Sequence, residues 1–222
     1  VIKGDVAGGL LFDITPVDND DSNDDEDGDG VDDANESAAS VMTYGQAPAV
    51  VIGQAGRSVT LGNVGTSDDA YGLVNRGSIG ADGVYDGITA TALQVGVSGG
   101  TVSLTGGLRN QGSIATSAYE ADAVNLHILS GAAVAKIWNE GTLSALMTGE
   151  GAHDAVALKI ESGASVPSLV NALSISAVVS GEAGDAIAIT DLSGTLTSLT
   201  NTHTISATIS PTDDSDDTDD TD

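Results

Sequence analysis

An asparagine that recurs five times at nearly constant spacing constrains this 222-residue chain more than any other feature. The five residues lie 35, 29, 32 and 30 positions apart and are Asn75, Asn110, Asn139, Asn171 and Asn201. Each follows a Leu or Ile two positions earlier and precedes another short apolar run that opens with Ser or Thr. A period near 30 residues indicates one supersecondary unit that is stacked repeatedly.

Two further signals recur in the same order between the Asn segments. An alternating run opens with Asp-Ala at positions 122, 154 and 185, and a Ser-Gly pair follows at 130, 162 and 193. The alternating residues are small or β-branched, which suits short strands that line a narrow interior. The repeat therefore predicts an all-β fold, a right-handed parallel β-solenoid (β-helix) of about five to six coils, with its handedness taken from the general crossover preference.

The repeats also predict specific ladders along the stack. We expect one interior ladder of the apolar residues two positions before each Asn, namely Leu73, Leu108, Ile137, Leu169 and Leu199. Each Asn is expected to adopt left-handed backbone and to stack its amide on the next coil's Asn. The carboxylates of Asp122, Asp154 and Asp185 are expected to accept hydrogen bonds from turn N–H groups, or alternatively to share a cation.

The repeat pattern divides the chain into four segments. Residues 1–15 are expected to supply the first strands of a partial coil, and residues 38–210 the solenoid repeats. Residues 16–37 form an acidic insertion, and residues 211–222 an acidic tail or linker. The first and last coils keep the apolar interior pattern without a visible polar cap, so we expect head-to-tail stacking of copies or continuation into a longer solenoid.

The composition and net charge of the chain limit the partners and the location that we expect for it. With 33 acidic and 6 basic residues, the net charge of −27 argues against nucleic acid or an anionic membrane as a partner. No segment is apolar enough to insert in a membrane, and the chain contains no Cys. An acidic, Cys-free chain rich in Gly, Ser and Thr is typical of exported bacterial proteins, which predicts an extracellular or cell-surface location.

The acidic insertion contains a pattern typical of calcium-binding loops. Carboxylates stand at positions 1, 3, 5, 9 and 12 of a twelve-residue loop with Gly30 at position 6. The expected calcium ligands are Asp25, Asp27, Asp29, the carbonyl of Val31, Asp33 and Glu36. Asp32 departs from the EF-hand pattern, and the loop is more similar to those of thrombospondin type 3 repeats. A solvated acidic loop is the alternative.

No arrangement typical of catalysis is present. His127, His153 and His203 fall at different repeat positions without metal-ligand spacing and are expected at the surface or in turns. Trp138 is expected to pack on the solenoid rather than to bind sugar. We therefore expect a protein that is not an enzyme, and a carbohydrate-active β-helix enzyme, a polysaccharide lyase or hydrolase, is the alternative.

The combination of these repeats resembles a known family. The patterns Leu-x-Asn-x-Gly-Ser-Ile, Asp-Ala-x-Ala-Ile and Ser-Gly-Ala-x-Val are similar to those in the passenger domains of bacterial autotransporters, particularly those of alphaproteobacteria. The similarity covers residues 1–12 and 41–210. It implies an extracellular structural solenoid that acts in adhesion or in end-to-end self-assembly, as a filament or surface layer ordered by calcium. A surface receptor or a polysaccharide is a further partner that the family would allow.

Overall fold

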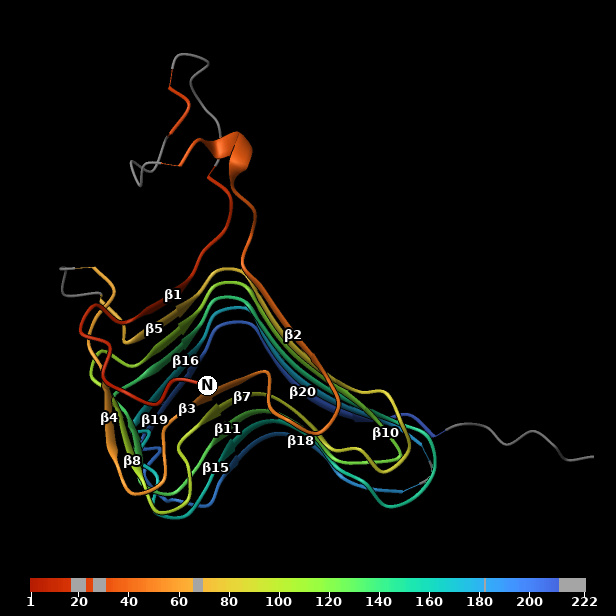
Figure 1. Ribbon diagram of the computed structural model, residues 1–222. Helices are drawn as coiled ribbons and strands as arrows, with labels where there is room; N and C mark the ends of the chain where they lie inside the picture. The colour runs from red at the N-terminus through yellow and green to blue at the C-terminus, as the bar shows by residue number, and fades with distance from the viewer. Residues whose placement is uncertain (17–22, 26–30, 66–69, 182, 212–222) are drawn as a thin grey trace, which may run out of the picture.

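The computed structural model is a parallel β-solenoid, as Figure 1 shows in a view down the stack of coils. It describes residues 1–16, 23–25, 31–65, 70–181 and 183–211. Every pairing between its named strands is parallel, and its one described helical segment is the three-residue 3-10 helix η1, Asp33–Asn35. The predicted fold class, an all-β parallel solenoid, is therefore confirmed. The predicted right-handedness stays a prediction.

The strands form four sheets, here called sheets I to IV. Sheet I contains β1 (Leu10–Phe12), β5 (Leu73–Asn75), β9 (Leu108–Asn110), β13 (Ile137–Asn139), β16 (Ser168–Asn171) and β19 (Ser198–Asn201). Sheet II contains β2 (Ser40–Tyr44), β6 (Ser78–Gly83), β10 (Ser113–Tyr119), β14 (Thr142–Thr148), β17 (Ser174–Ser180) and β20 (Thr204–Ile209). Sheet III contains β3 (Val50–Ile52), β7 (Ala90–Val95), β11 (Ala123–Ile128), β15 (Ala155–Ile160) and β18 (Ala186–Asp191). Sheet IV contains β4 (Ser58–Leu61), β8 (Thr101–Leu104) and β12 (Ala132–Val134).

Each coil visits the sheets in the order I, II, III, IV, and the chain makes about four turns. Three coils carry a strand in all four sheets, and a fourth reaches sheet IV through the single bridge between Ala133 and Ser165. Sheets I and II have six strands because they also include strands of incomplete coils. The predicted number of five to six coils is not confirmed.

The predicted interior ladder is present in sheet I. Leu73, Leu108, Ile137, Leu169 and Leu199 are successive partners in the strand register. The first four are fully buried, whereas Leu199 in the last described coil is 51% exposed. Burying one such side chain stabilises the fold by roughly 1.5–3 kcal/mol, so the repeated column is a main source of stability.

The asparagine that marks each repeat is the last residue of a strand, and its side chain points inward. Four of the five asparagines are fully buried. Each amide donates to the next: the Nδ2–Oδ1 distance is 2.8 Å from Asn75 to Asn110, and it is the same at every later step to Asn201. The predicted amide stacking is therefore confirmed.

The left-handed backbone expected for these asparagines was wrong. None of them has a positive φ, and Glu120 is the one described residue other than glycine that does. The left-handed turns belong instead to the Ser-Gly pairs, as at Gly131 and Gly163, where φ is 82° in both cases. A glycine adopts that conformation without steric cost, and this leaves each Asn free to extend its strand.

Candidate functional site

The edge formed by the last coil differs most from the rest of the molecule. The strands β18, β19 and β20 are terminal in sheets III, I and II, and no described strand pairs with their outer sides. Leu199 and Ile209 are 51% and 52% exposed, and Ile189 and Ile205 are only partly buried against the core. We call β18, β19, β20 and the intervening Leu196 the C-terminal edge.

Two series of hydrogen bonds run from coil to coil and end at this edge. Among the described residues, the last side chain of each series has no partner in a further coil. Asn171 Nδ2 donates to Asn201 Oδ1 at 2.8 Å and to the carbonyl of Thr204 at 2.9 Å, both in the next coil. Asn201 Nδ2 donates only to the nearby carbonyl of His203, at 3.1 Å, among the described residues. In each earlier coil, the Asn amide at this position donates to the Asn of the next coil.

The aspartates at 122, 154 and 185 form the second series. The carboxylate of Asp122 accepts the backbone N–H of Asp154 at 3.0 Å, and that of Asp154 accepts the N–H of Asp185 at 2.9 Å. The predicted hydrogen bonding to turn N–H groups is confirmed for Asp122 and Asp154, and there it offsets the repulsion between stacked carboxylates. No such N–H reaches the Asp185 carboxylate from the part of the chain that the structure describes.

Asp191 places a polar group at this edge that the repeat pattern did not reveal. It occupies an inward column of sheet III, directly after Ile160. Its carboxylate accepts hydrogen bonds from the Ser193 hydroxyl at 2.5 Å, from the Ser193 and Gly194 N–H groups, and from the Leu196 N–H at 3.1 Å. These bonds, that of the Ser193 hydroxyl above all, lower the pKa of Asp191. The expectation that the terminal coils lack any polar cap is therefore wrong at this position.

The opposite end of the solenoid is an apolar edge of the same kind. Ile2 pairs with Ile52 in sheet III, and Val6 pairs with Leu61 in sheet IV. The chain then continues into β1 in sheet I and, after the acidic insertion, into β2 in sheet II. We call Ile2, Val6, β1 and β2 the N-terminal edge; its inward side chains are partly buried against the core.

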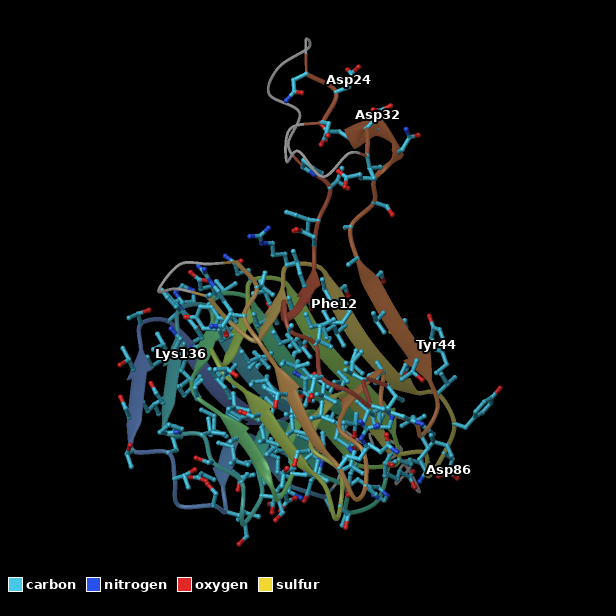
Figure 2. All side chains as sticks on the ribbon, turned by 60° about the vertical axis from the view of Figure 1, so that its left-hand side comes forward. Phe12, Asp24, Asp32, Tyr44, Asp86 and Lys136 are labelled. Atoms are coloured by element: carbon cyan, nitrogen blue, oxygen red, sulfur yellow. The ribbon has the colours of Figure 1, made fainter. Side chains whose placement is uncertain are left out.

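The acidic insertion projects away from both edges. Figure 2 shows Asp24 and Asp32 on a segment that leaves the coils carrying Phe12 and Tyr44. The backbone N–H of Asp33 donates to the carbonyl of Asp24 at 2.8 Å, which closes this segment on itself. A cleft of about 280 Å³ is lined by Asn23, Asp24, Asp32, Asp33 and Ala34.

The predicted calcium ligands are only partly described. Asp25, Val31, Asp33 and Glu36 lie in this segment, whereas Asp27 and Asp29 fall outside the described residues. The described residues contain no group of three or more His, Asp or Glu side chains arranged to hold a metal ion. The complete predicted shell therefore cannot be assembled from them, and calcium binding stays a prediction.

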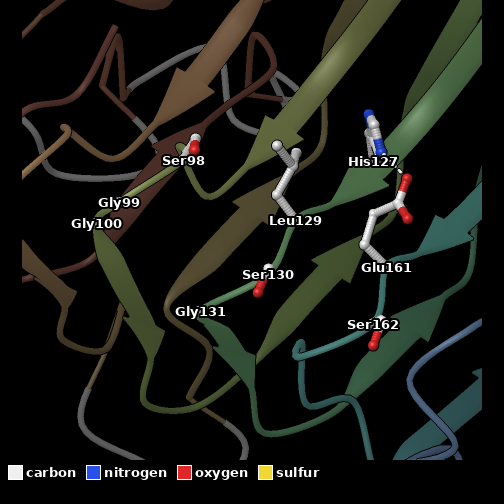
Figure 3. A pocket seen from close by; sticks show the side chains of 9 residues that line it. All are labelled: Ser98, Gly99, Gly100, His127, Leu129, Ser130, Gly131, Glu161 and Ser162. Atoms are coloured by element: carbon white, nitrogen blue, oxygen red, sulfur yellow. Dashed lines mark hydrogen bonds and ion pairs between the residues drawn. The ribbon is translucent and has the colours of Figure 1, made fainter.

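A surface groove of about 510 Å³ crosses the turns that follow sheet III, as Figure 3 shows. Its polar side chains include His127, Glu161 and serines of three successive Ser-Gly turns. His127 Nε2 lies 2.9 Å from Glu161 Oε1, and Lys159 Nζ contacts the same oxygen at 2.9 Å. Burial lowers the pKa of His127, and the hydrogen bonds from His127 and then from Lys159 lower the pKa of Glu161.

The polar contacts within this groove centre on Glu161. Among the described residues, His127 hydrogen-bonds to Glu161 and to none of the serine hydroxyls. Spacing along the sequence could not reveal this pair, because the two residues are 34 positions apart and meet only through the stacking of β11 and the turn after β15.

An aromatic cluster lies on the outer face of sheet I. Tyr71 and Trp138 meet edge to face with ring centroids 6.4 Å apart, and the Arg109 guanidinium lies 4.9 Å from the Trp138 ring centroid. Lys136 Nζ lies 4.3 Å from the centroid of Tyr71. Trp138 thus packs on the solenoid, as predicted, under cations that contribute about 0.5–1 kcal/mol each.

Comparison with protein-family models, with curated proteins and with solved structures found no match for this chain. The resemblance to autotransporter passenger domains therefore remains an expectation drawn from the repeat pattern. No helix among the described residues is long and apolar enough to cross a membrane.

Proposed function

We propose that this protein is a structural, cell-surface β-solenoid that acts in adhesion or self-assembly by accepting another solenoid coil on its C-terminal edge. The observation that carries the proposal is that edge itself. Its strands β18, β19 and β20 have 6, 4 and 6 residues and no described partner on their outer sides.

The physical drive for such docking has two parts. Unpaired N–H and C=O groups along an exposed strand are a template for pairing with another strand. The interior columns end at Leu199, which is half-exposed, and at Ile205 and Ile189, which are partly buried. Covering them removes apolar surface from water at about 25 cal/mol per Å². One added coil would satisfy both.

The extracellular location and the role of calcium belong to the same proposal. Net charge of −27 would make copies repel one another, and a divalent cation bound in the acidic insertion would reduce that repulsion. The family resemblance and the Cys-free composition support a location outside the cell.

Light scattering of the purified chain over a range of concentrations tests this function. Ile205→Asp places a carboxylate on the C-terminal edge, and we expect it to move assembly to at least about tenfold higher concentration, because burying an unpaired charge costs several kcal/mol. Tyr85→Asp is the matched control, since Tyr85 is 77% exposed and lies away from the edge. Equal assembly of both variants, or a parent chain that is monomeric throughout, would refute the proposed function.

A further inference from the structure

We propose that the groove at the turns after sheet III binds a neutral sugar ring of a saccharide. This site lies on the side of the solenoid and does not involve the C-terminal edge, so the binding is a second function beside the assembly proposed above. The shape of the groove, its balanced charge and its unused hydrogen-bonding groups favour this class of ligand.

A change in turn length from coil to coil creates the groove. Five residues connect β3 to β4, and five connect β7 to β8, whereas three connect β11 to β12. The next coil keeps the short turn, because Ile160 pairs with Ile128 and Ser165 bridges to Ala133. The surface of the solenoid therefore has a step between the turn after β7 and the turn after β11.

The step sets polar and apolar groups around one open volume. In Figure 3 the longer turn with Ser98 lies on one side, Glu161 and Ser162 lie on the other, and Leu129 and Ser130 lie between them. The groove has a volume of about 510 Å³. Sites for small ligands typically have about 300–1,000 Å³, so the groove has room for a sugar ring.

The charged groups of the groove are already balanced. Lys159 Nζ contacts Glu161 Oε1 at 2.9 Å, and His127 Nε2 lies 2.9 Å from the same oxygen. Burial lowers the pKa of His127, so its imidazole is neutral at pH 7. An anionic ligand would meet the Glu161 carboxylate and no unpaired cation among the described residues that line the groove. A neutral ligand fits this balance better than a charged one.

The polar groups of the groove keep hydrogen-bonding capacity for a ligand. Its three serine hydroxyls make no hydrogen bond to the part of the chain that the structure describes. Both contacts of the Glu161 carboxylate are to Oε1, which leaves Oε2 as an acceptor. The neutral His127 ring donates from Nε2 to this carboxylate, and its Nδ1 is then an acceptor. Sugar hydroxyls both donate and accept, so they match hydroxyls and acceptors alike.

The backbone beside the groove favours a saccharide over an extended peptide. The Gly131 N–H donates to the carbonyl of Gly163 at 2.9 Å, and the Val102 N–H donates to the carbonyl of Gly131 at 3.1 Å. An extended peptide binds mainly by pairing with unpaired backbone groups of a strand edge, and these groups are paired between coils. A saccharide instead uses side-chain hydroxyls and carboxylates, and its C–H groups pack on an apolar side chain such as Leu129.

Saturation-transfer difference NMR of the whole chain tests this site, because the method detects weakly bound ligands on particles of any size. The probes are the methyl glycosides of glucose, galactose and mannose, each compared with the methyl glycoside of its uronic acid. We expect at least one neutral probe to bind saturably, and its anionic counterpart to bind at least about tenfold more weakly, because its carboxylate would face that of Glu161.

Substitutions of serine locate the binding. Ser130→Ala combined with Ser162→Ala removes two groove hydroxyls and should weaken binding of the neutral probe at least about tenfold. Ser144→Ala combined with Ser176→Ala is the matched control, since these serines are register partners in sheet II, outside the groove, and should leave binding unchanged.

Three results would overturn the assignment. They are the absence of saturable binding by every neutral probe, equal binding of a neutral probe and its uronate, and equal effects of the two double variants. None of them bears on assembly through the C-terminal edge, which the Ile205→Asp variant tests separately.

Discussion

At the residue scale, the buried asparagines convert a repeat in sequence into a continuous hydrogen-bonded column. Asn110, Asn139 and Asn171 each donate to one neighbour and accept from the other, so each of them depends on both. Buried polar groups are costly when one partner is missing, and for this reason the column fixes the register as well as adding stability.

We expect Asn139→Ala to lower the free energy of unfolding by about 2–4 kcal/mol. The substitution leaves the Asn110 amide without its acceptor and the Asn171 oxygen without its donor, and it opens a cavity. Urea denaturation followed by circular dichroism measures the change. Asn201→Ala is the matched control at the exposed end and should cost about 1 kcal/mol or less. Equal losses in the two variants would contradict the role assigned to burial.

The pair of His127 and Glu161 predicts how stability responds to acid. The pKa of Glu161 is lowered in the folded state, so below its ordinary value of 4.5 the unfolded chain binds more protons than the folded one. Its contribution is present above pH 4.5 and is lost as pH falls through the lowered pKa. The lowered pKa of His127 acts in the same direction below 6.5.

Glu161→Gln should therefore destabilise the chain at pH 7 and have little effect near pH 3. Urea denaturation at the two pH values measures the difference, and Glu150→Gln, at an exposed position, is the control. A Glu161→Gln effect that is the same at both pH values would show that packing, and not the charge of Glu161, accounts for it.

At the scale of the elements, the sequence predicted the strands and their register because both follow from a repeated pattern. The column of Leu73 and its successors could be aligned on the asparagines before any strand was known. The backbone of each Asn was not predictable in this way, because Asn tolerates left-handed turns and strands alike. Asp191 was missed because its inward position becomes visible only when it is paired with Ile160.

The acidic insertion carries a separate prediction about calcium. We expect isothermal titration of the whole chain with Ca²⁺ to give a saturable heat, and Asp27→Ala combined with Asp29→Ala to abolish it, because the loop then loses two of its carboxylate ligands. Asp213→Ala combined with Asp214→Ala removes the same charge from the acidic tail and is the control. Heat that is unchanged by the loop substitutions would indicate diffuse counterion binding alone.

At the scale of the whole molecule, the solenoid is a stack of coils whose interior columns reach the described C-terminal edge. Asp191 places a hydrogen-bonded carboxylate at the end of one column of sheet III. The columns of sheets I and II end at this edge in apolar side chains. The sequence alone indicated open ends, but the order of the sheets at each edge required the structure.

Hydrogen exchange at increasing protein concentration tests self-assembly through the C-terminal edge most directly. Amides of β19 and β20 have no described partner strand on their outer side in a single copy, so we expect their exchange to slow as concentration rises. Amides of β11, which lies between β7 and β15, should exchange at a rate that does not depend on concentration. Exchange in β19 and β20 that stays the same from dilute to concentrated solution would contradict the account.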